Sequence, residues 1–204
     1  MRTRFPGLGL LAASVLLGFA NPAVSGYTFS LLDTLGGTHG SARAINNAGQ
    51  VVGYSSLTGD GDYHATLWNG TGATDLGTLG GSNSIAFAIN NAGQVVGDSS
   101  QITGGWSHAT LWNSGTAIGL SALAGYSGHS RAYAINSAGH VVGTSDNGDF
   151  GESRATLWSG ATATGLGTPG INSFATGIND SGQVVGGLDR RPPYYPRHPV
   201  EWQH

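Results

Sequence analysis

The stretch AINNAGQVVG at residues 44–53 decides the fold of this chain, because the same phrase returns three more times. It recurs as AINNAGQVVG at 88–97, AINSAGHVVG at 134–143 and GINDSGQVVG at 177–186. Asn tolerates left-handed backbone angles and Gly supplies a positive φ, so each copy predicts a tight hairpin turn between two strands. The apolar Ile before the turn and the Val-Val pair after it are the strand ends.

A second phrase lies between the hairpins and repeats with the same period. It is HATLW at 64–68 and 108–112, RATLW at 154–158 and HPVEW at 198–202. Each copy predicts a short strand that ends in an aromatic residue. Within one repeat, 73–79 predicts a second strand closed by Gly80 and Gly81, 85–89 a third, and 94–97 the start of a fourth.

Four short strands in about 44 residues are typical of a β-propeller blade. We therefore predict an all-β fold, a small propeller of four four-stranded blades that stack because no blade buries both faces alone. The expected structural positions are the repeated Trp and Asn residues: Trp68, Trp112, Trp158, Trp202, Asn46, Asn90, Asn136 and Asn179.

The two ends of the repeat region predict how such a ring would close. Residues 27–35 align with the second strand of a repeat, and 198–202 align with the first. Three strands at the start and one at the end would then share the fourth blade and remove an exposed sheet edge. An open array or a larger assembled ring are the alternatives.

Composition excludes several classes of function. The chain has 36 glycines, no cysteine and only 9% charged residues, with a net charge of −3. Disulfides, thiolate metal sites and cysteine nucleophiles are therefore excluded. An acidic chain with no lysine is a poor partner for nucleic acid or for an anionic membrane.

Residues 1–25 have the pattern of a signal peptide. Arg2 and Arg4 precede an apolar run at 8–20, and small residues follow it. The run is too short to span a bilayer as a helix, although an uncleaved anchor is the alternative. We therefore expect a secreted or extracellular protein (the periplasm is also possible) in which residues 26–204 form a single repeat domain.

The two repeated phrases resemble those of the HAF-type extracellular repeat family of bacteria. The resemblance rests on the His-Ala-x-Leu-Trp and Ile-Asn-x-x-Gly-x-Val-Val-Gly patterns and covers about residues 27–202. It implies a bacterial, exported protein. It implies no reaction, because the family has no assigned catalytic residues. We therefore expect a protein that is not an enzyme, and we expect no cofactor.

The titratable residues carry no marked catalytic or metal site. His64, His108 and His198 share a repeat position with Arg154, which favours hydrogen-bond donors over a metal ring. No pair stands out among the carboxylates considered for acid–base work, which are Asp33, Asp75, Asp98, Asp180 and Glu201. The segment with Asp146, Asp149 and Glu152 is a weak calcium candidate, more so than Asp60 and Asp62, and solvated turns explain both.

The segments that join successive repeats are the best candidate for a binding surface. They are 55–63, 99–107, 145–153 and 188–197, and their equivalent positions predict one shared loop face. They carry five aromatic residues: Tyr63, Trp106, Phe150, Tyr194 and Tyr195. Such residues favour a glycan or a cell-surface protein as ligand, unless they only fix their own loops. The alternatives are an exported carbohydrate-active enzyme with carboxylates on this face and a structural surface component.

Overall fold

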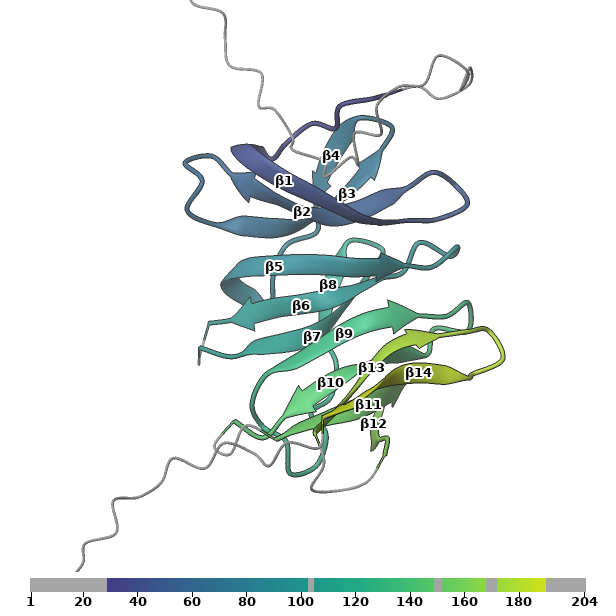
Figure 1. Cartoon of the computed structure of the whole chain (residues 1–204). Coiled ribbons are helices and arrows are strands. Elements are labelled where there is room, and N and C mark those ends of the chain that lie inside the picture. Colours follow the sequence, from purple (N-terminus) through teal and green to yellow (C-terminus); the bar gives the residue numbers. More distant parts are fainter. Residues whose placement is uncertain (1–28, 103–104, 149–151, 168–171, 190–204) are drawn as a thin grey trace, which may run out of the picture.

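The computed structural model describes residues 29–102, 105–148, 152–167 and 172–189, which form four antiparallel sheets and contain no helix. The all-β class is thus confirmed. The sheets follow one another as a stack, from the N-terminal sheet to the C-terminal one (Figure 1). The predicted signal peptide at 1–25, the strand at 198–202 and Trp202 lie outside the described residues. No helix of the described part is suited to crossing a bilayer.

Three sheets have four strands each, in chain order, and the fourth has two. The first sheet contains β1 (Gly36–Ile45), β2 (Val51–Leu57), β3 (Tyr63–Asn69) and β4 (Gly72–Asp75). The second contains β5 (Gly80–Ile89), β6 (Val95–Gln101), β7 (Ser107–Asn113) and β8 (Thr116–Gly119). The third contains β9 (Ser130–Ile135), β10 (Val141–Asp146), β11 (Ser153–Ser159) and β12 (Thr162–Gly165), and the fourth β13 (Asn172–Ile178) and β14 (Val184–Asp189).

The Asn-x-x-Gly hairpins form as the sequence predicts. In the second sheet, Gly93 has a φ of 79° and its N–H donates to the Asn90 carbonyl at 3.1 Å. The Asn90 side-chain oxygen accepts from the N–H groups of Ala92 and Gln94 at 3.1 and 2.9 Å. The asparagine thus holds its own turn, which explains why Asn is kept at this position in all four copies.

The same asparagines also join neighbouring sheets. The side-chain amide of Asn46 donates to the carbonyl of Asn90 at 3.2 Å, and Asn90 donates to the carbonyl of Asn136 at 3.1 Å. Asn136 continues the ladder to the carbonyl of Asn179 at 3.1 Å. Buried amides that satisfy both their own turn and the next one fix the spacing of the stack.

Apolar clusters fill the space between sheets, and each of the first two contains one repeated Trp. Trp112 packs with Val52 and Ala65 of the preceding sheet, and Trp158 packs with Val96 and Ala109 of its own preceding sheet. Both rings are about 1% exposed, so each buries roughly 150–250 Å² of surface. The indole N–H of Trp112 donates to the Gly77 carbonyl, and that of Trp158 to the Ser121 carbonyl.

Two strand boundaries differ from the prediction. Gly80 and Gly81 do not end a strand. They begin β5, so the second sheet starts at these glycines and ends with β8. Consequently the chain start does not supply three strands to the last sheet. The joining segment predicted at 99–107 is also shorter than expected, because β6 continues to Gln101 and β7 begins at Ser107, and Asp98 lies within β6.

The predicted N-terminal strand at 27–35 is also wrong within the described residues. Residues 29–34 have no regular structure, and Leu35 forms only an isolated bridge to Leu57. The strand that would pair with this segment aligns with 198–202, outside the described part. The Asp33 carbonyl nevertheless accepts a hydrogen bond from the Trp68 indole N–H at 2.7 Å, which is the contact that the next two repeats make at this position.

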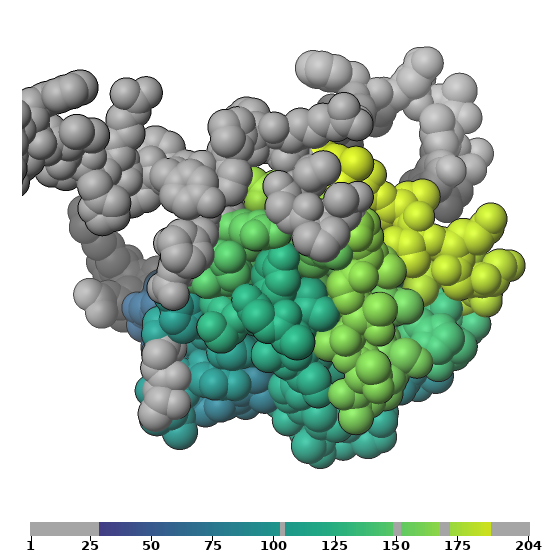
Figure 2. Space-filling view, turned by 90° about the horizontal axis from the view of Figure 1, so that it is seen from below, coloured from purple at the N-terminus to yellow at the C-terminus, as the bar shows by residue number. Residues whose placement is uncertain are grey.

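The described residues do not close into a ring. The first and fourth sheets are the two ends of the stack, and the β13–β14 hairpin lies beside the third sheet at one flank of the molecule (Figure 2). The described residues therefore show four sheets in succession but not the closed four-blade ring.

Candidate functional site

A β-bulge interrupts the first strand of every sheet at the same repeat position. In β1 the residues Ala42 and Ala44 pair with Gly53 and Val52, so Arg43 between them has no partner. The equivalent unpaired residues are Phe87 in β5, Tyr133 in β9 and Thr176 in β13. A bulge turns its extra side chain away from the regular alternation of the strand. All four side chains consequently line one open hollow of about 470 Å³, which we call the inner hollow.

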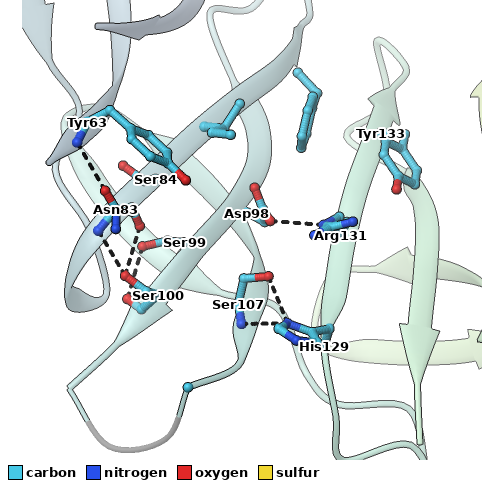
Figure 3. Close-up of a pocket in the computed structure, with 13 residues that line it drawn as sticks. Tyr63, Asn83, Ser84, Asp98, Ser99, Ser100, Ser107, His129, Arg131 and Tyr133 are labelled. Carbon is cyan, nitrogen blue, oxygen red and sulfur yellow. Dashed lines mark hydrogen bonds and ion pairs between the residues drawn. The ribbon is translucent and has the colours of Figure 1, made fainter. Parts of the chain in front are cut away.

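A second pocket of about 410 Å³ lies between the second and third sheets, which we call the loop-face pocket (Figure 3). Residues of β5, β6 and β9 form most of its walls, and the rest comes from Tyr63 of β3, Gly105, Ser107 of β7 and His129. Its volume is within the range of about 300–1,000 Å³ for small-molecule sites. Phe87 and Tyr133 line both cavities, and their rings are 5.5 Å apart, so the two cavities adjoin.

An ion pair crosses the loop-face pocket from one sheet to the next. The Asp98 carboxylate on β6 accepts from Arg131 Nε on β9 at 3.1 Å. The Asp98 side chain is only 10% exposed, whereas that of Arg131 is 48% exposed. Burial raises the pKa of Asp98, and the Arg131 guanidinium and the Ser107 hydroxyl oppose the rise only in part. A buried carboxylate with a raised pKa in a cavity is a common mark of a functional site.

His129 forms the adjoining wall beside the predicted loop. Its Nδ1 accepts from the backbone N–H of Ser107 at 2.9 Å, so the neutral ring carries its proton on Nε2. Trp106 packs edge-on against this ring, with the centroids 4.5 Å apart. The loop between β6 and β7 is thereby attached to the start of β9.

The predicted loop aromatics fall into two groups. Tyr63 lines the loop-face pocket, and Trp106 contacts it through His129. Phe150, Tyr194 and Tyr195 lie outside the described residues.

We did not predict Phe87, Arg131 or Tyr133 from the sequence, because they stand on strands rather than in loops. A signal was nevertheless present for Phe87 and Tyr133. In the phrases ARAI, AFAI, AYAI and ATGI, the second residue is different in every copy while its neighbours stay nearly constant. A variable residue in a constant structural frame marks a position that packing does not determine.

The repeated His and Arg residues act in hydrogen bonds to nearby segments. His64 Nδ1 is 2.8 Å from an Asp75 carboxylate oxygen, and Arg154 donates to the Gly167 carbonyl at 2.9 Å. Burial and the nearby His129 lower the pKa of His108. His198 lies outside the described residues.

The calcium candidate is only partly described. Asp149 lies outside the described ranges, and Glu152 accepts a hydrogen bond from the Tyr126 hydroxyl at 2.8 Å. Among the residues that the structure describes, no three His, Asp or Glu side chains are grouped to hold a metal ion.

Comparison with known proteins gave no relative: no protein-family model, no curated protein and no solved structure matches the chain. We therefore infer function from the two cavities and their side chains.

Proposed function

We propose that this protein is an exported, non-catalytic binding module of the HAF-type repeat family, and that its loop-face pocket binds a carbohydrate. The observation that carries the proposal is the composition of the pocket wall. Aromatic rings from Tyr63, Phe87 and Tyr133 stand beside a fixed Asp98–Arg131 pair.

This combination suits a sugar ring better than a purely apolar ligand. A sugar presents C–H groups that pack on aromatic faces and hydroxyls that need directional partners. The Asp98 carboxylate accepts hydrogen bonds from sugar hydroxyls, and Arg131 donates to them. Such hydrogen bonds to charged groups are shorter and stronger than those between neutral groups. Because the ion pair already orients both groups, little side-chain freedom remains to be lost on binding.

The described lining favours binding over hydrolysis. Glycoside hydrolysis usually requires two carboxyl groups about 5–10 Å apart. Asp98 is the only carboxylate among the described residues that line the loop-face pocket. An exported carbohydrate-active enzyme is therefore the less favoured function.

A glycan array with the purified protein tests the proposal. The variants are Tyr63→Ala and Asp98→Asn in the pocket, with Ile118→Ala as the matched control, because Ile118 is 45% exposed on β8 and outside the pocket. We expect binding to a defined set of glycans that falls at least tenfold in both pocket variants and is unchanged in the control. Absence of any glycan binding, or equal binding by all variants, would refute the proposal.

We also propose that the chain ends complete the fourth sheet and close the ring. The cluster around Val142 and Ala175 contains no Trp among the described residues, whereas the two preceding clusters contain Trp112 and Trp158. Val185 is 66% exposed although the equivalent Val52 and Val96 are fully buried. An apolar pocket of about 320 Å³ lies against β13 and β14. Residues 198–202 are the proposed occupant, with Trp202 in the Trp position.

A designed disulfide tests this closure, since the natural chain has no cysteine. Val52 pairs with Leu67, and Val96 with Leu111, so the repeat places Val185 opposite Glu201. The double substitution Val185→Cys and Glu201→Cys should cross-link quantitatively in mild oxidant as a monomer. The control replaces Val200 instead of Glu201, because neighbouring side chains of the proposed strand would face opposite sides of the sheet. Equal cross-linking of both pairs, or of neither, contradicts the closure.

A further inference from the structure

The inner hollow has a chemical character that the loop-face pocket lacks. Its bulge residues come from all four sheets and are an arginine, a phenylalanine, a tyrosine and a threonine. No carboxylate lines it among the described residues, so Arg43 gives it an unopposed positive charge. Positions that serve packing keep one residue type in every copy, as Trp68, Trp112 and Trp158 do. The bulge position is therefore a candidate for ligand contact.

Arg43 is held in a way that leaves its hydrogen-bond donors free. The guanidinium carbon lies 5.0 Å from the centroid of the Phe87 ring and 5.6 Å from that of Tyr54. Cation–π contacts of this kind restrain the flat group through its faces. Within the described part of the chain, Arg43 makes no hydrogen bond or ion pair, and its side chain is exposed. Its edge N–H groups are thus available to a planar anion.

The inner hollow also adjoins the loop-face pocket, with which it shares Phe87 and Tyr133. Tyr63 contacts Tyr54, with the ring centroids 5.5 Å apart. Arg43 contacts both Tyr54 and Phe87, and Phe87 contacts Tyr133, so these side chains form one row. Both ends of this row line the loop-face pocket. A ligand longer than one sugar ring that enters the loop-face pocket would therefore extend across Phe87 and Tyr133 toward Arg43.

We propose that the inner hollow binds the carboxylate of a uronic acid residue, as part of an acidic oligosaccharide whose next residue occupies the loop-face pocket. This inference rests on the proposed function, because it extends the sugar site. An arginine fork matches a carboxylate with two parallel hydrogen bonds, and a lysine does not. The Phe87 and Tyr133 rings supply the surface on which the pyranose ring packs.

The experiment measures binding to glucuronate- and galacturonate-containing oligosaccharides, each compared with its carboxyl-methylated form. The methyl ester removes the negative charge and one acceptor oxygen's charge-assisted hydrogen bond, and it adds one methyl group. The natural protein should bind the acidic form at least tenfold more tightly, and 1 M salt should reduce this preference because Arg43 is exposed. Arg43→Gln should remove the preference, and Arg43→Lys should retain only a small part of it. Thermal unfolding of both variants shows whether the fold is unchanged, as expected for an exposed side chain.

The outcomes separate this inference from the proposed function. Equal binding of acidic and methylated forms, or a preference that persists in Arg43→Gln, overturns the uronate site. If neutral glycans alone bind and Asp98→Asn weakens them, the sugar site stands and the uronate site is refuted. If no glycan binds in any form, both are refuted.

Discussion

The glycine that ends each Val-Val-Gly phrase is the position where one methyl group should be most damaging. A Cβ built on Gly97 meets the Ile85 carbonyl oxygen of β5 far inside the 3.0 Å limit that real Cβ contacts essentially never cross. Gly53, Gly143 and Gly186 meet the equivalent carbonyls in their own sheets. For Gly97→Ala, β5 and β6 would have to separate by on the order of 1 Å next to the fully buried Val96. We expect a loss of about 3 kcal/mol in the free energy of unfolding.

Thermal and urea unfolding, followed by circular dichroism, measure this loss. About 3 kcal/mol corresponds to a decrease of roughly 6–12 °C in Tm for a chain of this size. Gly72→Ala is the matched control, because Gly72 is also in a strand and its added Cβ meets nothing within 4 Å. Its effect should stay within about 1 kcal/mol. If both variants are equally stable, close strand approach is not what requires glycine in this phrase.

Three further predictions follow from burial and charge. Trp112→Ala should cost about 3–5 kcal/mol of unfolding free energy, whereas Trp106→Ala, at a ring that is 41% exposed, should cost far less; similar losses in urea titrations would contradict the packing role. Hydrogen bonds from Thr38 lower the pKa of Asp60 from 3.8 to about 2, so this carboxylate stabilises the fold above pH 3.8 and the contribution is lost as the pH falls toward 2. An NMR titration that finds an ordinary pKa for Asp60, or an Asp60→Asn variant with the same acid stability profile, would refute this. Glycan affinity should decrease as the pH is lowered, because Asp98 becomes protonated. Since burial raises the pKa of Asp98, this decrease should occur at a pH above the ordinary range for aspartate, and Asp98→Asn should lose the pH dependence.

The repeated phrases predicted the local structure well, because turn chemistry is encoded by neighbours in sequence. Asn90 and Gly93 adopt the expected hairpin, and HATLW lies in β7 as expected. The sheet boundaries were predicted less well. Gly80 and Gly81 have the composition of a turn, but a positive φ of 100° at Gly80 starts β5 instead. A periodic sequence defines the length of a repeat and leaves open where one sheet ends.

The candidate site was predicted only at its rim. Tyr63 and Trp106 are aromatic residues in variable segments, which composition reveals. The pairing of Asp98 with Arg131 joins residues 33 positions apart on different sheets, and no local pattern encodes that contact. The bulges depend on a register shift between strands, which is a property of strand pairing in three dimensions.

The most direct test of the account maps the ligand on the protein itself. Backbone NMR spectra should be recorded during titration with the tightest-binding uronate oligosaccharide from the array. We predict that the largest shift changes occur at the amides of Arg43, Phe87, Arg131 and Tyr133, on the first strands of three sheets. Changes concentrated on the outer strands β4, β8 and β12 would contradict it.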